Sequence, residues 1–472
     1  MRRMFATPRL PRRILLAGAG AALVALASIG AIGAGSSDAD ARIPGDPLVA
    51  PPSELAAFAN LAETATIVTG GTAKPMPMPS TSEAKTPDVG TLPASPVGRG
   101  AAPPAASIDL DRVARSGDDY VVTLADGRRA VLTLDPALQE LAEQLLEQAR
   151  APRGAIVAMA PDGRILALAG RRTKEPTGSR EGTFDWRLAA DAWAPAASVF
   201  KLVTASALVD AGVDPDGKVC YHGGVRSVLD HNLRDDKRDS RCESLGYGVA
   251  HSNNAILGKL AFQNLEPKAL EAEARTFGWT DPLPATLALG GTIGALVVPA
   301  GRDLEFAKTA AGFSSDAKLS VVGGAIVAAT FAGDGEQPMP RIVASIDGNA
   351  VASAPSRRVI SAKTARTVAR MMAETCDSGS AAKSFGRSNT LRVAGKTGTL
   401  ARTEPFFMEH SWFVGYAPAT KPEIIVSVLF GNSESWRLRG HEAARRLIDR
   451  MVRPAARDKH RASRRDATRS RS

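Results

Sequence analysis

The chain has 472 residues and a formal net charge of +10, from 59 Lys and Arg against 49 Asp and Glu. The charge lies at the two ends, because residues 1–13 sum to +5, residues 453–472 sum to +6, and the residues between sum to about −1. A nucleic-acid-binding domain carries positive charge on the folded face that meets phosphate, so this distribution argues against nucleic acid as a partner. The 44% hydrophobic content excludes wholesale disorder, and three cysteines are too few for a disulfide scaffold.

The N-terminus has the pattern of an export signal. Five arginines within residues 1–13 precede 22 uncharged residues from Ile14 to Gly35, a run long enough to span a bilayer as a helix. Basic residues before an apolar run keep the N-terminus in the cytoplasm, and Ala39-Asp40-Ala41 offers a small-x-small cleavage site. We therefore predict that residues 1–41 are a cleaved signal peptide or a membrane anchor. The protein would then belong to the cell envelope, either anchored in the inner membrane and facing the periplasm or secreted into it.

Two further segments have compositions that cannot bury a core. Residues 42–106 hold 12 of the 31 prolines, which predicts a disordered stalk. Residues 453–472 hold eight basic and two acidic residues and few apolar ones, which predicts a disordered basic tail. The folded domain is accordingly predicted to span residues 107–452.

The folded domain is predicted to begin with a β-hairpin, because the strand-like runs 120–124 and 129–133 flank Asp126-Gly127. Asp135-Pro136 then reads as the N-cap and first residue of a helix that continues to Ala149. Apolar strands are expected at 155–160 and 165–169.

The rest of the domain is predicted to be helical in the middle and strand-rich at the end. Helices are expected at 198–211, through most of 250–315, and at 320–332, 361–374 and 434–451, with strands at 391–399, 411–417 and 423–430. Strands early and late with helices between them predict one sheet built from both ends of the domain, with a helical insertion.

The first candidate motif is Ser198-Val199-Phe200-Lys201. Positions i and i+3 of a helix lie about one turn apart on the same face, so Lys201 is within reach of the Ser198 hydroxyl. A serine needs a base to become a nucleophile, and a lysine can serve if burial or a neighbouring cation lowers its pKa. Ser-x-x-Lys also occurs at Ser82, Ser315 and Ser380, but Ser82 lies in the stalk and the other two in polar segments that we predict to be exposed.

Two further motifs follow in the chain. Ser252-Asn253-Asn254 offers a hydroxyl that can relay a proton and an amide that can bind a substrate. Lys396-Thr397-Gly398-Thr399 closes an apolar segment, and its lysine and two hydroxyls suit a carboxylate, while Gly398 permits a close backbone approach. Taken alone, each motif also fits an ordinary element: an amphipathic helix, a helix cap or an edge strand.

In this order the three motifs resemble the signature of the penicillin-binding proteins and serine β-lactamases. Residues 132–146, 154–170 and 411–418 resemble further parts of the penicillin-binding transpeptidase domain, so the resemblance covers about residues 130–452. It implies a mixed α/β fold, with an antiparallel five-stranded sheet flanked by helices and a helical subdomain. It also implies a penicillin-sensitive serine enzyme that works without a cofactor or metal ion.

The resemblance assigns a role to each motif residue. Ser198 would attack a D-Ala-D-Ala bond of a peptidoglycan stem peptide and form an acyl-enzyme, with Lys201 as the base. Ser252 would pass a proton to the leaving amine, and Lys396 would tune the field around it. Substrate would be held by Asn254, Thr397, Gly398 and Thr399, and the N–H groups of Ser198 and Thr399 would form the oxyanion hole. β-Lactams would acylate Ser198 because they mimic D-Ala-D-Ala.

The chain departs from the family pattern in one place near the nucleophile. Pro195-Ala196-Ala197 precedes Ser198, where most members have Pro-Gly. We also expect neither the glycosyltransferase domain of the bifunctional members nor the large N-terminal module of the division enzymes.

The motifs and the resemblance leave four functions open. They are D,D-transpeptidase, which we favour, D,D-carboxypeptidase, a class D-like β-lactamase, and a β-lactam- or muropeptide-sensing receptor without turnover. A class A β-lactamase needs a glutamate on a loop to activate water, and the stretch 287–296 contains no carboxylate.

Cys220 and Cys242 flank a polar loop rich in Asp and Arg. In an oxidising compartment a disulfide is the natural interpretation, while a metal site with His222 and His231 or free thiols are the alternatives. Closing a loop of this length would stabilise the fold by roughly 3 kcal/mol on the chain-entropy model.

Overall fold

The structure is a computed structural model, and it describes residues 108–386 and 391–452. The predicted export segment 1–41, the stalk 42–106 and the tail 453–472 lie outside the described residues. In the part of the chain that the structure describes, no helix has the length and apolar character needed to cross a membrane.

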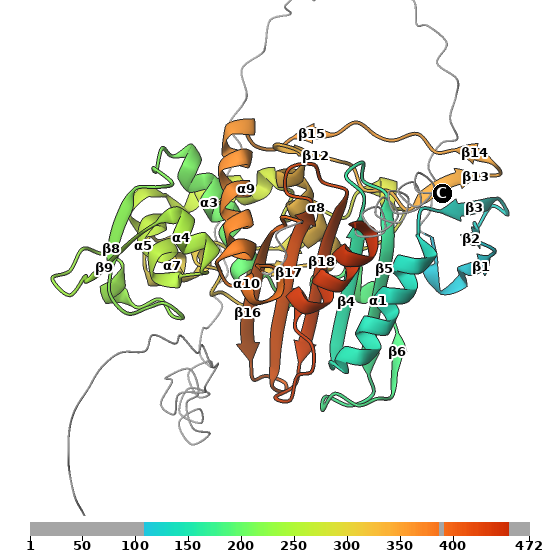
Figure 1. The fold of residues 1–472 in the computed structure, drawn as a ribbon, viewed down its shortest axis with the longest axis horizontal. Helices are drawn as coiled ribbons and strands as arrows, with labels where there is room; N and C mark the ends of the chain where they lie inside the picture. The colour runs from blue at the N-terminus through green and yellow to red at the C-terminus, as the bar shows by residue number, and fades with distance from the viewer. Residues whose placement is uncertain (1–107, 387–390, 453–472) are drawn as a thin grey trace, which may run out of the picture. The chain divides into compact units, whose positions relative to one another are not determined.

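A six-stranded antiparallel sheet forms the centre of the domain (Figure 1). Its strands lie in the order β16 (Ala394–Arg402), β17 (Met408–Ala417), β18 (Ile424–Asn432), β4 (Arg153–Met159), β5 (Ile165–Thr173) and β6 (Gly182–Phe184). The C-terminal strand β18 pairs with the early strand β4, so the sheet is built from both ends of the domain, as predicted. The five long strands are the five expected, and β6 adds a sixth, exposed strand of three residues at one edge.

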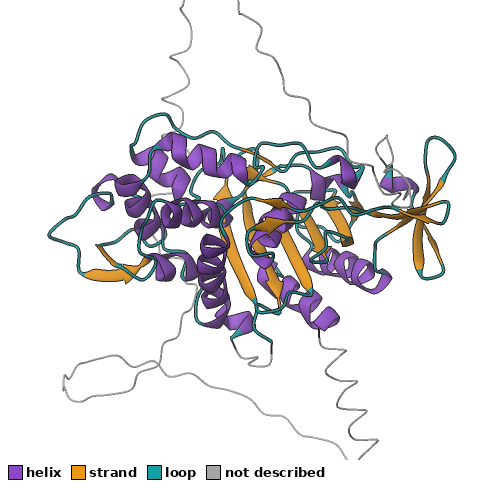
Figure 2. Cartoon of the chain, turned by 90° about the horizontal axis from the view of Figure 1, so that it is seen from above, coloured by secondary structure: helices purple, strands orange, loops and turns teal. Residues whose placement is uncertain are grey.

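One face of this sheet is covered by α1 (Pro136–Ala149) and by a helix over residues 440–452. Asp135 caps α1 by accepting a hydrogen bond from the N–H of Leu138, and Pro136 occupies the first turn, as the sequence predicts. The C-terminal helix begins at residue 440 rather than at 434. Both helices lie against the strands of the sheet (Figure 2). They bury apolar side chains there, and this packing forms one of the two hydrophobic cores.

The opposite face packs against α8 (Val321–Ala332), a helix that is buried along almost its whole length. Beyond it, a helical subdomain comprises α3 (Lys201–Asp210), α4 (Leu245–Ala250), α5 (Asn254–Asn264), α6 (Pro267–Thr276) and α7 (Leu304–Ala310). Helix α9 (Ala362–Asp377) contacts β16 on one side and α3 and α4 on the other, so it joins the subdomain to the sheet.

A second sheet was only half predicted. The hairpin of β2 (Asp119–Thr123) and β3 (Arg129–Leu132) forms as expected, but it belongs to a five-stranded sheet. The other members are β1 (Ala114–Ser116), β13 (Val343–Ile346) and β14 (Asn349–Ala350). Pairing of β3 with β13 joins segments more than 200 residues apart, which a local pattern cannot reveal.

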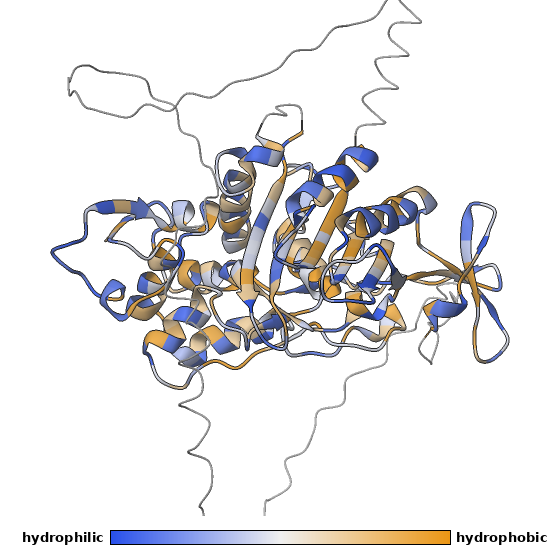
Figure 3. Ribbon diagram, turned by 90° about the horizontal axis from the view of Figure 1, so that it is seen from below, coloured by the Kyte–Doolittle hydropathy of each residue, from blue (hydrophilic) through white to orange (hydrophobic). Residues whose placement is uncertain are grey.

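The remaining elements are short. They are α2 (Arg187–Ala190), α10 (Ala382–Phe385), β7 (Ala194–Pro195), β8 (Lys218–Tyr221), β9 (Arg241–Ser244), β10 (Gly294–Ala295), β11 (Lys318–Leu319), β12 (Glu336–Gln337), β15 (Arg357–Arg358), and the 3₁₀ turns η2 (Leu110–Arg112), η3 (Ala197–Val199), η4 (Asp230–Asn232) and η5 (Ala285–Leu287). Figure 3 shows the contrast between the apolar strands of the central sheet and the hydrophilic projecting loop of the β8–β9 hairpin.

Candidate active site

The predicted nucleophile lies on a turn that two distant segments hold in place. Ser198 belongs to η3, which leads directly into α3. Just before it, the carbonyl oxygen of Pro195 accepts a hydrogen bond from Trp412 Nε1 on β17 at 2.8 Å, and the N–H of Ala196 donates to the carbonyl of Ala317 at 2.7 Å. The turn is therefore fixed against both the central sheet and the segment before α8.

Ala197 has a φ of 50°, in the left-handed region that non-glycine residues rarely adopt. It occupies the position where the family pattern has glycine. Alanine here adopts a backbone conformation that would cost glycine nothing.

Lys201 is the partner of Ser198. Its side chain is completely buried, and its Nζ lies 2.6 Å from Ser198 Oγ and 2.7 Å from Asn254 Oδ1. Burial, reinforced by the nearby charge of Lys396, lowers the pKa of Lys201 well below 10.5. A neutral amine at this position can accept the hydroxyl proton of Ser198, which is the task of a general base.

Ser252 and Lys396 form a second hydroxyl–amine pair. Lys396 Nζ donates to Ser252 Oγ at 2.9 Å and to the carbonyl oxygen of Thr397 at 2.9 Å. Lys396 is also completely buried, and this burial lowers its pKa to about 7. Ser252 lies in the connection between α4 and α5 with a φ of 57°. The three motifs, far apart in sequence, thus meet in one cluster.

The predicted substrate residues lie around this cluster. Asn254 begins α5, and its Oδ1 is occupied by Lys201. Gly398 faces the nucleophile turn closely: a Cβ atom there would lie 3.3 Å from both the Ala196 oxygen and the Ala197 Cβ. Thr397 is half-buried and Thr399 is exposed, and both lie on β16, the edge strand of the sheet.

Ser380 is the residue at this site to which the sequence pattern gave no role. It lies in the turn that follows α9, and its hydroxyl oxygen is 2.6 Å from Thr397 Oγ1. The sequence places it in a second, polar Ser-x-x-Lys and predicts it to be exposed, which it is. Its proximity to Thr397 depends on the packing of α9 against β16, for which the local sequence carries no signal.

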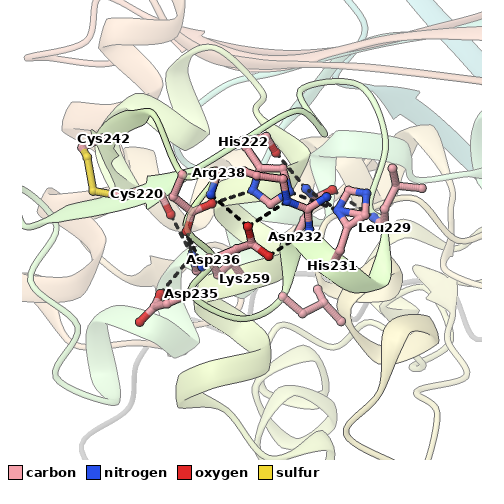
Figure 4. Close-up of polar contacts among 12 residues, drawn as sticks. Cys220, His222, Leu229, His231, Asn232, Asp235, Asp236, Arg238, Cys242 and Lys259 are labelled. Carbon is pink, nitrogen blue, oxygen red and sulfur yellow. Dashed lines mark hydrogen bonds and ion pairs between the residues drawn. A yellow bond between two sulfur atoms is a disulfide. The ribbon is translucent and has the colours of Figure 1, made fainter.

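Cys220 and Cys242 are joined by a disulfide between β8 and β9, 22 residues apart in sequence (Figure 4). Within the loop that it closes, the carbonyl oxygens of Gly224 and Val225 accept hydrogen bonds from the N–H groups of Ala255 and Asn254, at 2.9 Å and 3.0 Å. The loop therefore contacts the first turn of the helix that carries Asn254.

A buried lysine fixes the rest of this loop (Figure 4). Lys259, on α5, is completely buried, and its Nζ contacts Asp239 Oδ2 at 2.7 Å and the carbonyl oxygen of Cys220 at 2.8 Å. Asp239 also pairs with His222 Nδ1 at 2.6 Å, and His222 Nε2 lies 3.2 Å from His231 Nδ1. The two histidines named in the metal alternative are thus part of a hydrogen-bonded chain. In residues 108–386 and 391–452, no group of three or more His, Cys, Asp or Glu side chains that could hold a metal ion is found.

Comparison with known proteins identifies the family of the chain. The penicillin binding protein transpeptidase domain matches residues 154–450, and the chain belongs to this family. The chain is 28% identical over 340 residues to the peptidoglycan D,D-transpeptidase PbpA of Mycolicibacterium smegmatis, a match that covers 63% of this chain and 66% of that protein. It is 26% identical over 337 residues to PbpA of Mycobacterium tuberculosis, covering 64% and 66%.

Solved structures share the fold. Penicillin-binding protein A from Mycobacterium tuberculosis, as its imipenem acyl-enzyme, has a TM-score of 0.56 at 23% identity and covers 68% of this chain and 79% of that one. Penicillin-binding protein 3 from the same organism, complexed with aztreonam, has a TM-score of 0.59 at 21% identity and covers 71% and 80%. The predicted family and fold class are therefore confirmed.

Proposed function

We propose that the protein is a penicillin-sensitive peptidoglycan D,D-transpeptidase that works through an acyl-enzyme on Ser198. The observation that carries this proposal is the 2.6 Å contact between the Ser198 hydroxyl and the fully buried Lys201 amine. A second buried amine, that of Lys396, donates a hydrogen bond to the hydroxyl of Ser252. The PbpA relatives are named as peptidoglycan D,D-transpeptidases, which supports the same reaction.

The first half of the reaction transfers the donor peptide to the enzyme. Lys201 takes the proton of Ser198 as its oxygen attacks the carbonyl carbon between the two D-alanines, and an ester forms as the C–N bond breaks. Ser252 relays the proton that Lys201 took from Ser198 to the departing D-Ala amine, so Lys201 and Ser252 both return to their starting protonation states. The N–H groups of Ser198 and Thr399 stabilise the oxyanion that develops in between.

The donor is recognised by its C-terminal carboxylate and its extended backbone. Thr397, Thr399 and the positive charge of Lys396 suit the carboxylate. The edge strand β16 can accept a peptide as an additional strand, with Gly398 allowing it to approach closely, and the amide of Asn254 can hold the peptide bond. β-Lactams present the same carboxylate and a strained amide, so they acylate Ser198.

In the second half, the amine of a neighbouring stem peptide attacks the ester, which releases Ser198 and leaves a crosslink. This reaction belongs outside the cytoplasm, and the apolar run Ile14–Gly35 supports export to the envelope with an inner-membrane anchor or a periplasmic product. We propose the same domain limits as the sequence does, with the transpeptidase domain at 107–452.

The test incubates the purified protein with a stem-pentapeptide donor and an amine acceptor and identifies the products. Crosslinked peptide supports the proposal. Release of D-Ala without crosslinking would indicate a carboxypeptidase, and rapid hydrolysis of β-lactam would indicate a β-lactamase. Stable penicillin labelling with no turnover of any donor would indicate a sensor and contradict the transpeptidase assignment.

A further inference from the structure

The turn that follows α9 connects two walls of the active site. The N–H of Ser380 donates to the carbonyl oxygen of Ala250 at 3.0 Å, and Ala250 is the last residue of α4, two residues before Ser252. Through its side chain, the same residue contacts Thr397 Oγ1 on β16 at 2.6 Å. Ser380 therefore joins the segment of the Ser-x-Asn motif to the Lys-Thr-Gly strand.

The backbone of this turn is held independently of the Ser380 side chain. The N–H groups of Gly379 and Ala381 donate to the carbonyls of Glu374 and Thr375, both at 2.9 Å. Gly379 lies so close to α4 that a Cβ atom there would be 2.2 Å from the Ala250 oxygen. The position of the Ser380 hydroxyl is thus determined by backbone contacts that remain if the hydroxyl is removed.

Among the described residues, the Ser380 hydroxyl has one hydrogen-bond partner, Thr397, which is a proposed substrate residue. Ser380 is exposed, so burial does not require its hydroxyl to be paired. A carboxylate can only accept hydrogen bonds, so Thr397 must direct its own proton toward it. When Ser380 donates to Thr397 Oγ1, it leaves the Thr397 proton free and fixes the direction in which that proton points.

We propose that Ser380 is a positioning residue that orients the Thr397 hydroxyl toward the C-terminal carboxylate of the donor. The inference rests on the proposed function and extends it to a residue outside the three motifs. It predicts that Ser380 matters for substrates that carry a free carboxylate and not for those whose carboxylate is masked.

The experiment measures the second-order rate constant of acylation of the full-length protein by benzylpenicillin and by benzylpenicillin methyl ester. Ser380→Ala should slow acylation by the free acid about 3- to 10-fold, the range expected for one neutral hydrogen bond, and should leave the ester reaction unchanged. Ser380→Thr, which keeps the hydroxyl, should restore the rate with the acid. The thermal midpoint of Ser380→Ala should match that of the wild type, because the backbone contacts remain.

Ser378 supplies a matched control on the same turn. Within residues 108–386 and 391–452, its hydroxyl contacts only the Glu374 carbonyl, at 3.5 Å, so Ser378→Ala should react like the wild type with both probes. Equal losses for acid and ester in Ser380→Ala would indicate a merely structural role and overturn the inference, as would a wild-type rate with the acid. A wild-type protein that neither probe labels would instead overturn the proposed function itself.

Discussion

Two lysines dominate the site at the scale of single residues. Lys201 and Lys396 are both completely buried, although a charged amine is costly to remove from water. Burial lowers both pKa values, and the charge of Lys396 lowers that of Lys201 further. A substrate carboxylate beside Lys396 would favour its charged form, so in the proposed mechanism Lys201 is a neutral amine for proton transfer and Lys396 is a cation for binding.

The pH dependence of acylation should show both roles. As the pH falls through the pKa of Lys201, the base becomes protonated and acylation is lost. As the pH rises above about 7, Lys396 loses its charge in the free enzyme and its attraction for the carboxylate weakens, so the second-order rate constant falls again. Lys396→Arg, whose guanidinium stays charged, should remove the alkaline decline of penicillin acylation, and a decline that persists in this variant would refute the assignment.

The burial of Lys396 should also make the free energy of unfolding depend on pH. The folded-state pKa of Lys396 is about 7 against an ordinary value of 10.5, so the unfolded chain binds more protons between these two values. Its contribution to the free energy of unfolding therefore rises with pH through this window. Lys396→Met should be more stable than the wild type near neutral pH by about 1–3 kcal/mol and less dependent on pH, while losing acylation. Denaturant unfolding at several pH values tests this, and an unchanged pH slope would contradict it.

At the scale of elements, the nucleophile turn carries strain that glycine would relieve. Ala197 has a φ of 50°. Ala197→Gly should therefore raise the free energy of unfolding by up to about 1 kcal/mol, because the left-handed conformation disfavours alanine by more than glycine loses in chain entropy. Denaturant unfolding measures the change, and the penicillin acylation rate should stay within about twofold. A destabilised variant would show that the Ala197 methyl packs more favourably than the strain costs.

The β8–β9 hairpin and α5 form a second connected element. The disulfide closes a 22-residue loop, while Lys259 and the first turn of α5 hold that loop from inside. Replacing Cys220 and Cys242 with serine should lower the free energy of unfolding by about 3 kcal/mol. A reductant should lower the thermal midpoint of the wild type and leave that of the double variant unchanged. Equal sensitivity of both proteins to reductant would show that the disulfide contributes nothing.

The elements whose signals are local could be predicted. Asp135-Pro136 marks the start of α1, Asp126-Gly127 marks a hairpin, and continuous apolar runs mark the long strands. What could not be predicted depends on pairing across long sequence distances. The β3–β13 pairing is one case, and the anchoring of Pro195 by Trp412, 217 residues away, is another.

The candidate site, like the fold, could be predicted only in part from the sequence. The motif residues Ser198, Lys201, Ser252 and Lys396 could be chosen because their order in the chain is distinctive. Their contacts could not be predicted, and the hydrogen bond from Lys201 Nζ to Asn254 Oδ1 is one that the motif order does not indicate. Ser380 carries a Ser-x-x-Lys pattern in a polar, exposed segment, and its contact with Thr397 depends on the packing of α9 against β16, which that pattern does not indicate.

At the scale of the whole molecule, the net charge of +10 has little to do with the site. Residues 453–472 supply +6 of it and residues 1–13 supply +5, and both lie outside the described residues. The proposed chemistry uses two lysines of a nearly neutral domain. Removing residues 453–472 should therefore leave the rate of penicillin acylation unchanged, measured with a fluorescent penicillin, and a large loss would assign the tail a part in the fold or the site.

The central claim is that Ser198 is the acylated nucleophile. Peptide mapping by mass spectrometry after incubation with benzylpenicillin tests it directly. We predict a single penicilloyl adduct, on the peptide that contains Ser198, and no adduct in Ser198→Ala, whose fold should be intact. A covalent adduct on another residue of the wild type, or continued labelling of Ser198→Ala, would contradict the mechanism.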